Sequence, residues 1–230
     1  MANPNSHVAE FISLFNQTAR YHHRYEVFRD FVQMAACAVH NQVAFSQSLE
    51  DEYLGLAKRY ERADLDRMGK LLGILRCGLG LQQPIYGDML GKIFMSLELG
   101  DARRGQFFTP FDVSRMMAVM TAHDLDSELK RKPFLTVGEP ACGAGGMVIA
   151  VAEQFEQAGY PPSEHMFASC VDIDPVACAM CFLQLALLRI PAEIITGNTL
   201  TLKYNRVIRT PVYYLHGWPA RLARYEKSVA

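Results

Sequence analysis

The segment from residue 134 to residue 157 constrains the fold more than any other part of the sequence. Phe134-Leu-Thr-Val137 predicts a short buried strand, and Met147 to Gln157 predicts a helix. Between them lies Gly143-Ala-Gly145-Gly146, where glycine lets the backbone approach a ligand closely. The N-terminus of the following helix adds free N–H groups and partial positive charge at the same place. The segment therefore predicts a ligand-binding loop at the carboxyl end of a strand.

Strands and helices continue to alternate beyond this loop. Strands are predicted at Met166-Phe-Ala-Ser-Cys-Val171 and Ala192-Glu-Ile-Ile-Thr196, and a fourth at Thr210-Pro-Val-Tyr-Tyr-Leu215. Asp174 is a good N-cap for the intervening helix, and Pro175 suits its first turn. This order is typical of an α/β fold with a right-handed, doubly wound parallel sheet.

The first part of the chain reads as helices instead. Apolar residues recur at three- and four-residue steps within residues 8–80, as one buried helical face requires. Further helices are predicted at Glu50 to Lys58 and Ala63 to Leu75, and Gly78-Leu-Gly80 ends the last of them. No repeat or long linker follows in the sequence, so we expect these helices to pack on the sheet.

Composition and charge narrow the class of protein. Half of the residues are apolar and 20% are charged, which favours a globular chain. The longest apolar stretch, Ala177 to Leu188, contains Gln184 and falls short of the roughly 20 residues that span a membrane. Met1 to His7 lacks the pattern of a secretory signal, so a cytoplasmic protein without a membrane contact is expected.

Two smaller features leave alternatives open. Cys178 and Cys181 form a C-x-x-C pair in an apolar helical stretch without a second pair, which favours buried thiols over a metal or redox site. Residues 198–230 carry six basic residues and one acid, Glu226. Such a tail suits phosphates or an acidic partner, and equally a solvated terminus.

Residues around the glycine loop indicate the kind of ligand. The dinucleotide fingerprint G-x-G-x-x-G would need glycine where the chain has Val148. Glu139, just before the loop, would repel a phosphate and suits an ammonium group instead. Asp172, at the end of the second predicted strand, is placed to accept from ribose hydroxyls. A ligand with a ribose, an amino group and no phosphate indicates S-adenosylmethionine.

Several segments resemble one known family in their order and spacing. The sequence resembles the adenine-N6 DNA methyltransferases, most closely the modification subunit of type I restriction–modification systems. The resemblance covers roughly residues 85 to 202 and rests on Asp88-Met-Leu-Gly-Lys-Ile-Phe94, Gly105-Gln-Phe-Phe-Thr-Pro110, Glu139-Pro-Ala-Cys-Gly-Ala-Gly-Gly146, Cys170-Val-Asp-Ile-Asp-Pro175 and Gly197-Asn-Thr-Leu200.

The resemblance implies S-adenosylmethionine as cofactor and no metal. It gives a role in cofactor binding to Phe108, Thr109, Pro110, Glu139, Ala141, Gly143, Gly145, Asp172, Ile173 and Asn198. The first three would cover the methionine end, whose amino group would meet Glu139, and the glycines would pass under it. Asp172 would hold the ribose, and Ile173 would lie against the adenine. Asn198 stands where the family usually has Asp, and its amide oxygen can still accept from the adenine amino group.

The site of methyl transfer departs from the family. There the fourth strand ends in Asn-Pro-Pro-Phe or a close variant, which binds the target amine and stacks on the flipped base. This sequence contains no such tetrad, and His216-Gly-Trp-Pro219 follows its predicted fourth strand. Trp218 could stack on a base, but the His216 ring cannot donate and accept like an amide. The catalytic residues therefore stay unassigned.

These features combine into one expected architecture. We expect a helical N-terminal region over residues 1–104 and a partial cofactor-binding domain over residues 105–230. The fold would be a Rossmann-like methyltransferase sheet, truncated after its fourth strand. Val212 to Leu215 would then form an uncovered edge, which predicts a homodimer or another restriction–modification subunit as partner near residues 210–219.

Three functions fit this architecture. The family activity is adenine-N6-specific methylation of DNA, with DNA bound directly or through a complex. The alternative is a non-catalytic regulator, decoy or assembly partner of a DNA modification system, because the tetrad is absent. A third possibility is a methyltransferase that shares only the fold and acts on a small molecule.

Overall fold

The fold is built around a four-stranded sheet in a computed structural model, which describes residues 4–80, 84–99, 108–122 and 124–229. Its strands are β1 (Leu135–Glu139), β2 (Met166–Asp172), β3 (Ala192–Asn198) and β4 (Lys203–Arg209). They lie in the order β1-β2-β3-β4. The first three are parallel, whereas β4 returns antiparallel to β3.

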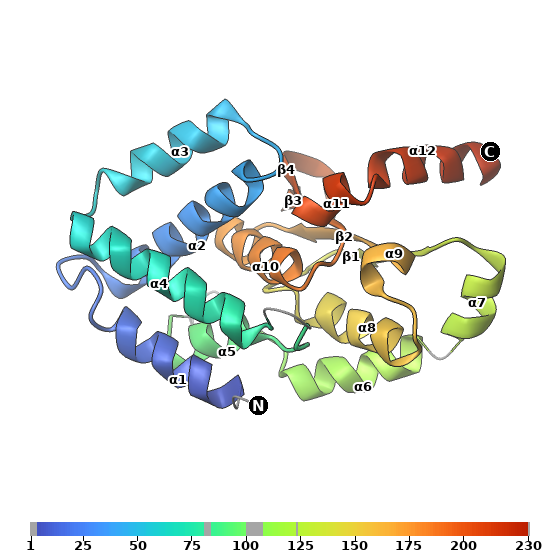
Figure 1. The fold of residues 1–230 in the computed structure, drawn as a ribbon, viewed down its shortest axis with the longest axis horizontal. Helices are drawn as coiled ribbons and strands as arrows, with labels where there is room; N and C mark the ends of the chain where they lie inside the picture. The colour runs from blue at the N-terminus through green and yellow to red at the C-terminus, as the bar shows by residue number, and fades with distance from the viewer. Residues whose placement is uncertain (1–3, 81–83, 100–107, 123, 230) are drawn as a thin grey trace.

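Helices cover both faces of this sheet (Figure 1). The elements between and after the strands are α8 (Gly146–Gln157), α9 (Pro162–His165), α10 (Pro175–Leu187), α11 (Pro211–Leu215) and α12 (Trp218–Val229). Met166, Ala168 and Cys170 of β2 belong to the main core together with residues of α8 and α10. Phe167 points to the opposite face, where it packs against Trp218 at the start of α12. Alternating side chains of β2 thus serve two separate clusters.

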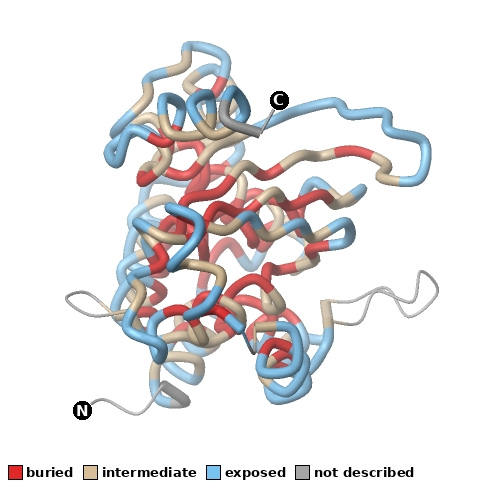
Figure 2. Tube along the Cα trace, turned by 90° about the vertical axis from the view of Figure 1, so that its right-hand side faces the viewer, coloured by how far each residue is buried: buried red, intermediate tan, exposed pale blue. Residues whose placement is uncertain are grey.

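Seven helices precede the sheet within the described residues. They are α1 (Pro4–Phe15), α2 (Arg24–Asn41), α3 (Gln47–Ala57), α4 (Arg62–Gly78), α5 (Met89–Ser96), α6 (Phe111–Thr121) and α7 (Leu125–Arg131). α2 and α5 contact α10, and α6 contacts α8. Their buried side chains join those of α8, α10 and the strands in one continuous apolar cluster, which occupies the centre of the molecule (Figure 2). The N-terminal helices therefore pack directly on the sheet's own helices.

The α/β fold class is confirmed, and local signals placed most elements correctly. Each of the first three predicted strands overlaps an observed strand, and the helix predicted after the glycine loop begins at Gly146. The Asp174 side chain caps α10 by accepting from the N–H of Val176 at 2.9 Å. The division of the chain at residues 104 and 105 lies outside the described residues and stays a prediction.

The predicted fourth strand is wrong. Residues 211–215 form helix α11, and the fourth strand comes earlier, as β4. Pro211 occupies the first turn of the helix, where its missing N–H costs nothing. The hydroxyl of Thr210 donates to the Ile190 carbonyl at 2.8 Å and accepts from Ala192 N–H at 3.0 Å, which fixes where the helix starts. The edge on which the partner near residues 210–219 was predicted is therefore not a strand.

Trp218 and His216, which stand in the sequence where the family has its tetrad, lie in different surroundings. Trp218 is fully buried on the sheet face opposite α8 and α10, between Phe134 and Phe167. Its indole N–H donates to the Ser163 carbonyl at 3.1 Å. His216 follows the end of α11 and is exposed. The Trp218 ring therefore packs a core in this structure and is not exposed for stacking on a flipped base.

No helix within the described residues is long and apolar enough to cross a membrane.

We predict that Trp218→Ala lowers the free energy of unfolding by about 3–5 kcal/mol, because it opens a void between two rings and leaves a carbonyl without its donor. Urea denaturation followed by circular dichroism measures the change. Leu215→Ala is the control, because Leu215 is 67% exposed and its loss should change stability by at most about 0.5 kcal/mol. Equal effects of the two substitutions would contradict the buried position of Trp218.

Candidate functional site

A cavity of about 200 Å³ lies at the carboxyl ends of β1 and β2, beside the start of α8. It brings together five of the ten residues predicted to bind the cofactor, namely Phe108, Thr109, Ala141, Gly143 and Asp172. Its other lining residues are Asp88, Ser114, Cys142, Ala144, Gly146, Met147 and Ala177. Segments far apart in the sequence therefore meet where the glycine loop predicts a ligand.

The glycine loop needs glycine at two positions. Gly143 has a φ of +53°, and a Cβ there would lie 3.0 Å from a ring carbon of Phe108. Gly145 has a φ of +92°, and a Cβ there would lie 3.0 Å from the Cys181 sulfur. Other residues rarely adopt these backbone angles. The Phe108 ring is itself held edge-on against buried Phe94, with 5.2 Å between centroids, so the loop and the ring form one wall of the cavity.

Asp172 links the end of β2 to the glycine loop. One carboxylate oxygen accepts from the Gly143 N–H at 2.8 Å, and the other accepts from the Asp174 N–H at 2.9 Å. Each oxygen of an ionised carboxylate can accept a further hydrogen bond. The side chain is thus fixed in place and still able to accept from the two hydroxyls of a ribose.

Three other predicted residues lie close to the cavity but do not line it. Glu139 Oε1 accepts from the Ala141 N–H at 3.1 Å, and this local bond turns the chain after β1. Gly145 is buried under the loop against Cys181. Pro110 lines an adjoining cavity of about 370 Å³, which shares Phe108 and Thr109 with the first.

The two residues predicted to meet the adenine stand outside the cavity. Ile173 is 69% exposed just past β2. Asn198 Oδ1 accepts from the N–H groups of Leu200 and Thr201 at 2.9 and 3.1 Å, so both of its lone pairs hold the turn after β3. Thr199 donates to the Pro140 carbonyl at 2.6 Å, which draws this turn toward the glycine loop.

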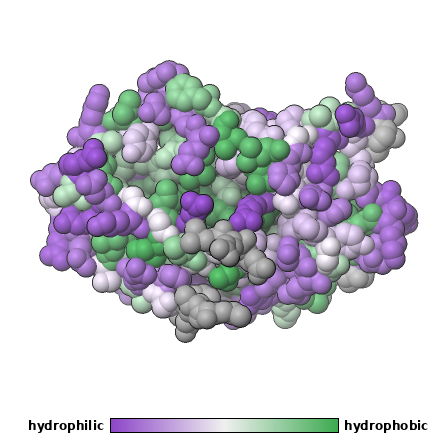
Figure 3. Space-filling view, viewed as in Figure 1, coloured by the Kyte–Doolittle hydropathy of each residue, from purple (hydrophilic) through white to green (hydrophobic). Residues whose placement is uncertain are grey.

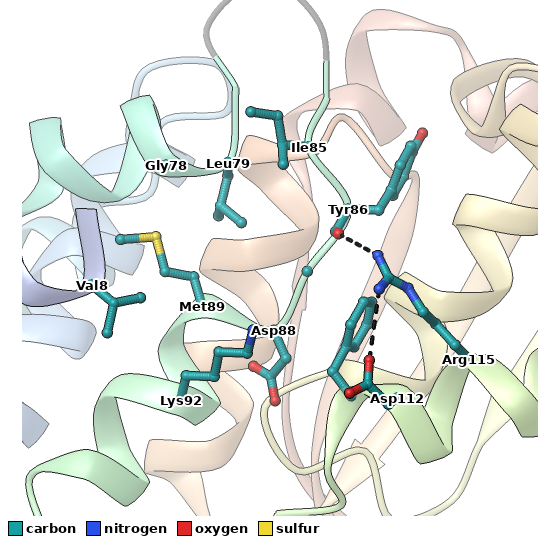
Figure 4. Close-up of a pocket in the computed structure, with 12 residues that line it drawn as sticks. Val8, Gly78, Leu79, Ile85, Tyr86, Asp88, Met89, Lys92, Asp112 and Arg115 are labelled. Atoms are coloured by element: carbon teal, nitrogen blue, oxygen red, sulfur yellow. Dashed lines mark hydrogen bonds and ion pairs between the residues drawn. The ribbon is translucent and has the colours of Figure 1, made fainter. Parts of the chain in front are cut away.

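Two polar residues that sequence reasoning left without a role line the same cavity. Asp88 is only 4% exposed, and its burial raises the pKa of its carboxyl group. Ser114 on α6 is fully buried, and its hydroxyl has no hydrogen-bond partner among the described residues. Asp88 lies in a segment that resembles the family, whereas nothing in the local sequence distinguishes Ser114. Figure 4 shows Asp88 beside Lys92 in a neighbouring pocket.

Gln184 holds this part of the site together from inside α10. Its side-chain N–H₂ donates to Asp88 Oδ1 at 2.8 Å and to the Ala144 carbonyl at 2.7 Å. Its carbonyl oxygen accepts from the Leu90 N–H at 3.0 Å. The side chain is fully buried. The polar residue that interrupts the apolar run of this helix is the signal that could have identified it.

The thiols of Cys178 and Cys181 are free and buried, as the apolar setting of the C-x-x-C pair predicts. Hydrogen bonding to Cys142, together with burial, raises the pKa of both. In the part of the chain that the structure describes, no group of three or more His, Cys, Asp or Glu residues could hold a metal ion.

A second hollow, of about 260 Å³, lies between α2, α10 and β4. Ala36, Phe182 and Ile208 contribute to its apolar lining, and Glu52 forms an ion pair with Arg206 at 3.0 Å beside it. On the face in Figure 3, apolar side chains gather over the middle, where α2 and α10 lie. None of the ten predicted residues lines this hollow, so it is a poorer candidate for the cofactor.

The comparison with protein families identifies the chain. The model of the N-6 DNA methylase family matches residues 83–214, which is more than half of the sequence. This chain belongs to the N-6 DNA methylase family. The predicted resemblance to adenine-N6 DNA methyltransferases is thereby confirmed at the level of the family.

Among solved structures, the chain is similar to a protein from Listeria monocytogenes described as a class I S-adenosylmethionine-dependent methyltransferase. The two are 18% identical with a TM-score of 0.47, over 85% of this chain and 55% of the other. The chain thus spans about half the length of that protein. No curated protein matches the sequence.

We predict that Gly145→Ala destabilises this methylase-family chain more than Gly159→Ala does. Both glycines have positive φ, +92° and +82°, but a Cβ at Gly159 meets nothing within 4 Å. Backbone strain alone costs about 1–2 kcal/mol at each site. The contact with the Cys181 sulfur adds about 1–3 kcal/mol at Gly145 only. Thermal and urea denaturation of the two variants measure the difference, and identical losses would mean that the loop tolerates a side chain.

Proposed function

We propose that this chain binds S-adenosylmethionine in the cavity at the ends of β1 and β2, as a component of a DNA adenine modification system. The observation that carries the proposal is the convergence of Phe108, Thr109, Gly143 and Asp172 on one cavity. Family membership over residues 83–214 supports the choice of ligand and makes DNA the expected substrate or partner. A role like that of a type I modification subunit is the finer form of this proposal.

The cavity fits the chemistry of such a ligand. When bound, S-adenosylmethionine supplies an electrophilic methyl group on a positively charged sulfur. The glycine loop and the Phe108 ring form one wall of the cavity. They lie so close together that a Cβ at Gly143 would contact the ring. Asp172 offers free lone pairs to a ribose diol, and the described lining residues of the cavity include carboxylates but no Lys or Arg. Its lining residues therefore suit a cationic, phosphate-free ligand.

We further propose that the chain does not transfer the methyl group to adenine by itself. The sequence has no Asn-Pro-Pro-aromatic segment to orient an exocyclic amine. Trp218, the aromatic residue that follows the predicted fourth strand, is buried on the sheet face opposite α8 and α10. This favours a regulatory, decoy or assembly role within the modification system.

A second candidate function is a methyltransferase that is completed by another strand. β1 forms an edge of the described sheet, so one side of its backbone has no strand partner there. Such an edge can pair with a strand that another chain supplies. Because β1 runs into the glycine loop, that strand would end beside the proposed cofactor cavity.

We expect S-adenosylhomocysteine to bind the purified chain in isothermal titration calorimetry. Asp172→Asn should weaken binding by about 1.5–3 kcal/mol, because it removes a charged acceptor from the ribose. Asp174→Asn is the matched control, since Asn caps helices as well as Asp and Asp174 does not line the cavity. Absence of binding at millimolar ligand would refute the proposed function.

We expect no transfer of tritium from labelled S-adenosylmethionine to adenine in duplex DNA by the chain alone. The reason is the missing group that would hold the target amine. Counts should equal those of the Asp172→Asn variant, whose cofactor binding is impaired. Transfer above that level, located on the adenine N6, would show that the chain carries a complete reaction site.

A further inference from the structure

Three cavities meet at the side chain of Asp88. It lines the proposed cofactor cavity, the adjoining cavity at Pro110, and the pocket of about 250 Å³ in Figure 4. Asp88 precedes α5 and caps it, because Oδ1 accepts from the Gly91 N–H at 2.8 Å. A cap alone does not explain a buried carboxylate at the junction of three cavities.

The two carboxylate oxygens of Asp88 differ in their surroundings. Oδ1 accepts from Gly91 and from the Gln184 amide, each at 2.8 Å. Oδ2 has no hydrogen-bond partner among the described residues, and it lies 3.3 Å from where a Cβ on Gly146 would stand. Oδ2 therefore lies between Gly91 and the end of the glycine loop, and no described residue donates a hydrogen bond to it.

The negative charge of the buried Asp88 carboxylate makes Oδ2 an unusual acceptor. The side chain is almost fully buried, and its desolvation raises the pKa of the carboxyl group. Among the described residues, Lys92 is the cation that acts on it, from an exposed position and without an ion pair to it within 4 Å. A desolvated carboxylate is stabilised strongly when a cation reaches it. The free oxygen thus suits a positively charged donor.

Ser114 supplies the complementary group. It lies one helical turn into α6, lines the same cavity as Asp88, and is fully buried. Its hydroxyl oxygen has no partner among the described residues. A buried hydroxyl without a hydrogen-bond partner destabilises the protein. A ligand atom that accepts from it would remove this cost. The cavity thus offers one free acceptor and one free donor.

From this pair we infer that Asp88 and Ser114 form a subsite for the amino-acid end of the ligand. Asp88 Oδ2 accepts from the α-ammonium group, and the Ser114 hydroxyl donates to the α-carboxylate. The inference rests on the proposed function and moves the ammonium contact from Glu139 to Asp88. Glu139 does not line the cavity, and one of its oxygens already accepts from the Ala141 N–H. With the ribose at Asp172, the amino-acid end lies on the Asp88 side of the glycine loop.

The test uses S-adenosylhomocysteine and two analogues, one with hydrogen in place of the α-amino group and one with hydrogen in place of the α-carboxylate. Calorimetry gives the ratio of dissociation constants for each analogue. For the unmodified chain, we expect each analogue to bind about 10- to 100-fold more weakly. An amino-free analogue that binds as tightly as S-adenosylhomocysteine would overturn the assignment without any variant.

Two variants then separate the roles of the residues. Asp88→Asn keeps an oxygen for Gly91 and Gln184 but presents N–H₂ to the cavity. It should remove the discrimination against the amino-free analogue and leave that against the carboxylate-free analogue. Ser114→Ala should do the reverse. If both ratios survive in both variants, the subsite is elsewhere.

The controls distinguish this inference from a general loss of charge or fold. Asp112→Asn removes a carboxylate whose side chain is 95% exposed near the same cavities, and it should change neither ratio. Glu139→Gln tests the assignment of the ammonium contact to Glu139. If this variant, and not Asp88→Asn, loses the discrimination against the amino-free analogue, the assignment to Asp88 is refuted. Without ligand, Asp88→Asn should melt at the same temperature or higher, because a desolvated charge is gone. If the chain binds none of the three ligands, the proposed function itself fails.

Discussion

The buried side-chain amide of Gln184 connects the N-terminal helices of the described chain to the part that forms the sheet. Gln184 bonds at once to the Asp88 carboxylate, the Leu90 N–H and the Ala144 carbonyl, so it joins α10 to the start of α5 and to the glycine loop. All of these groups are buried, where an unpaired polar group costs about 1–3 kcal/mol. Together with the bond from the Gly143 N–H to Asp172, this side chain positions the glycine loop and therefore shapes the cavity.

The sequence predicts the fold well where local signals and packing agree. The first three predicted strands, and an Asp-Pro helix start at residues 174–175, appear where expected. β4 escaped prediction because it is an edge strand with mostly exposed residues, so its pattern carries little contrast. Residues 210–215 are rich in residues that favour strands, yet the bonds of Thr210 and the fixed φ of Pro211 start a helix there.

The residues of the candidate site also differ in how well the sequence predicts their role. Phe108, Gly143 and Asp172 belong to segments whose residue types already indicate a ligand, and the structure gathers them in one cavity. Asp88 and Ser114 gain their meaning only from contacts between distant segments. Asp88 and Gln184, for example, are 96 positions apart. Local periodicity shows that a helix has a buried face, but it cannot show which buried group lacks a partner.

The C-terminal helices pack differently from the rest of the molecule. Trp218, Phe134 and Phe167 form a cluster of their own, separate from the continuous core that contains Gln184. Cooperative opening follows such boundaries between clusters. We therefore expect the amide protons of α12 to exchange with solvent through partial openings that leave the cavity intact. Those of α10 should exchange only when the whole core opens, so the outer helix would open independently of the core.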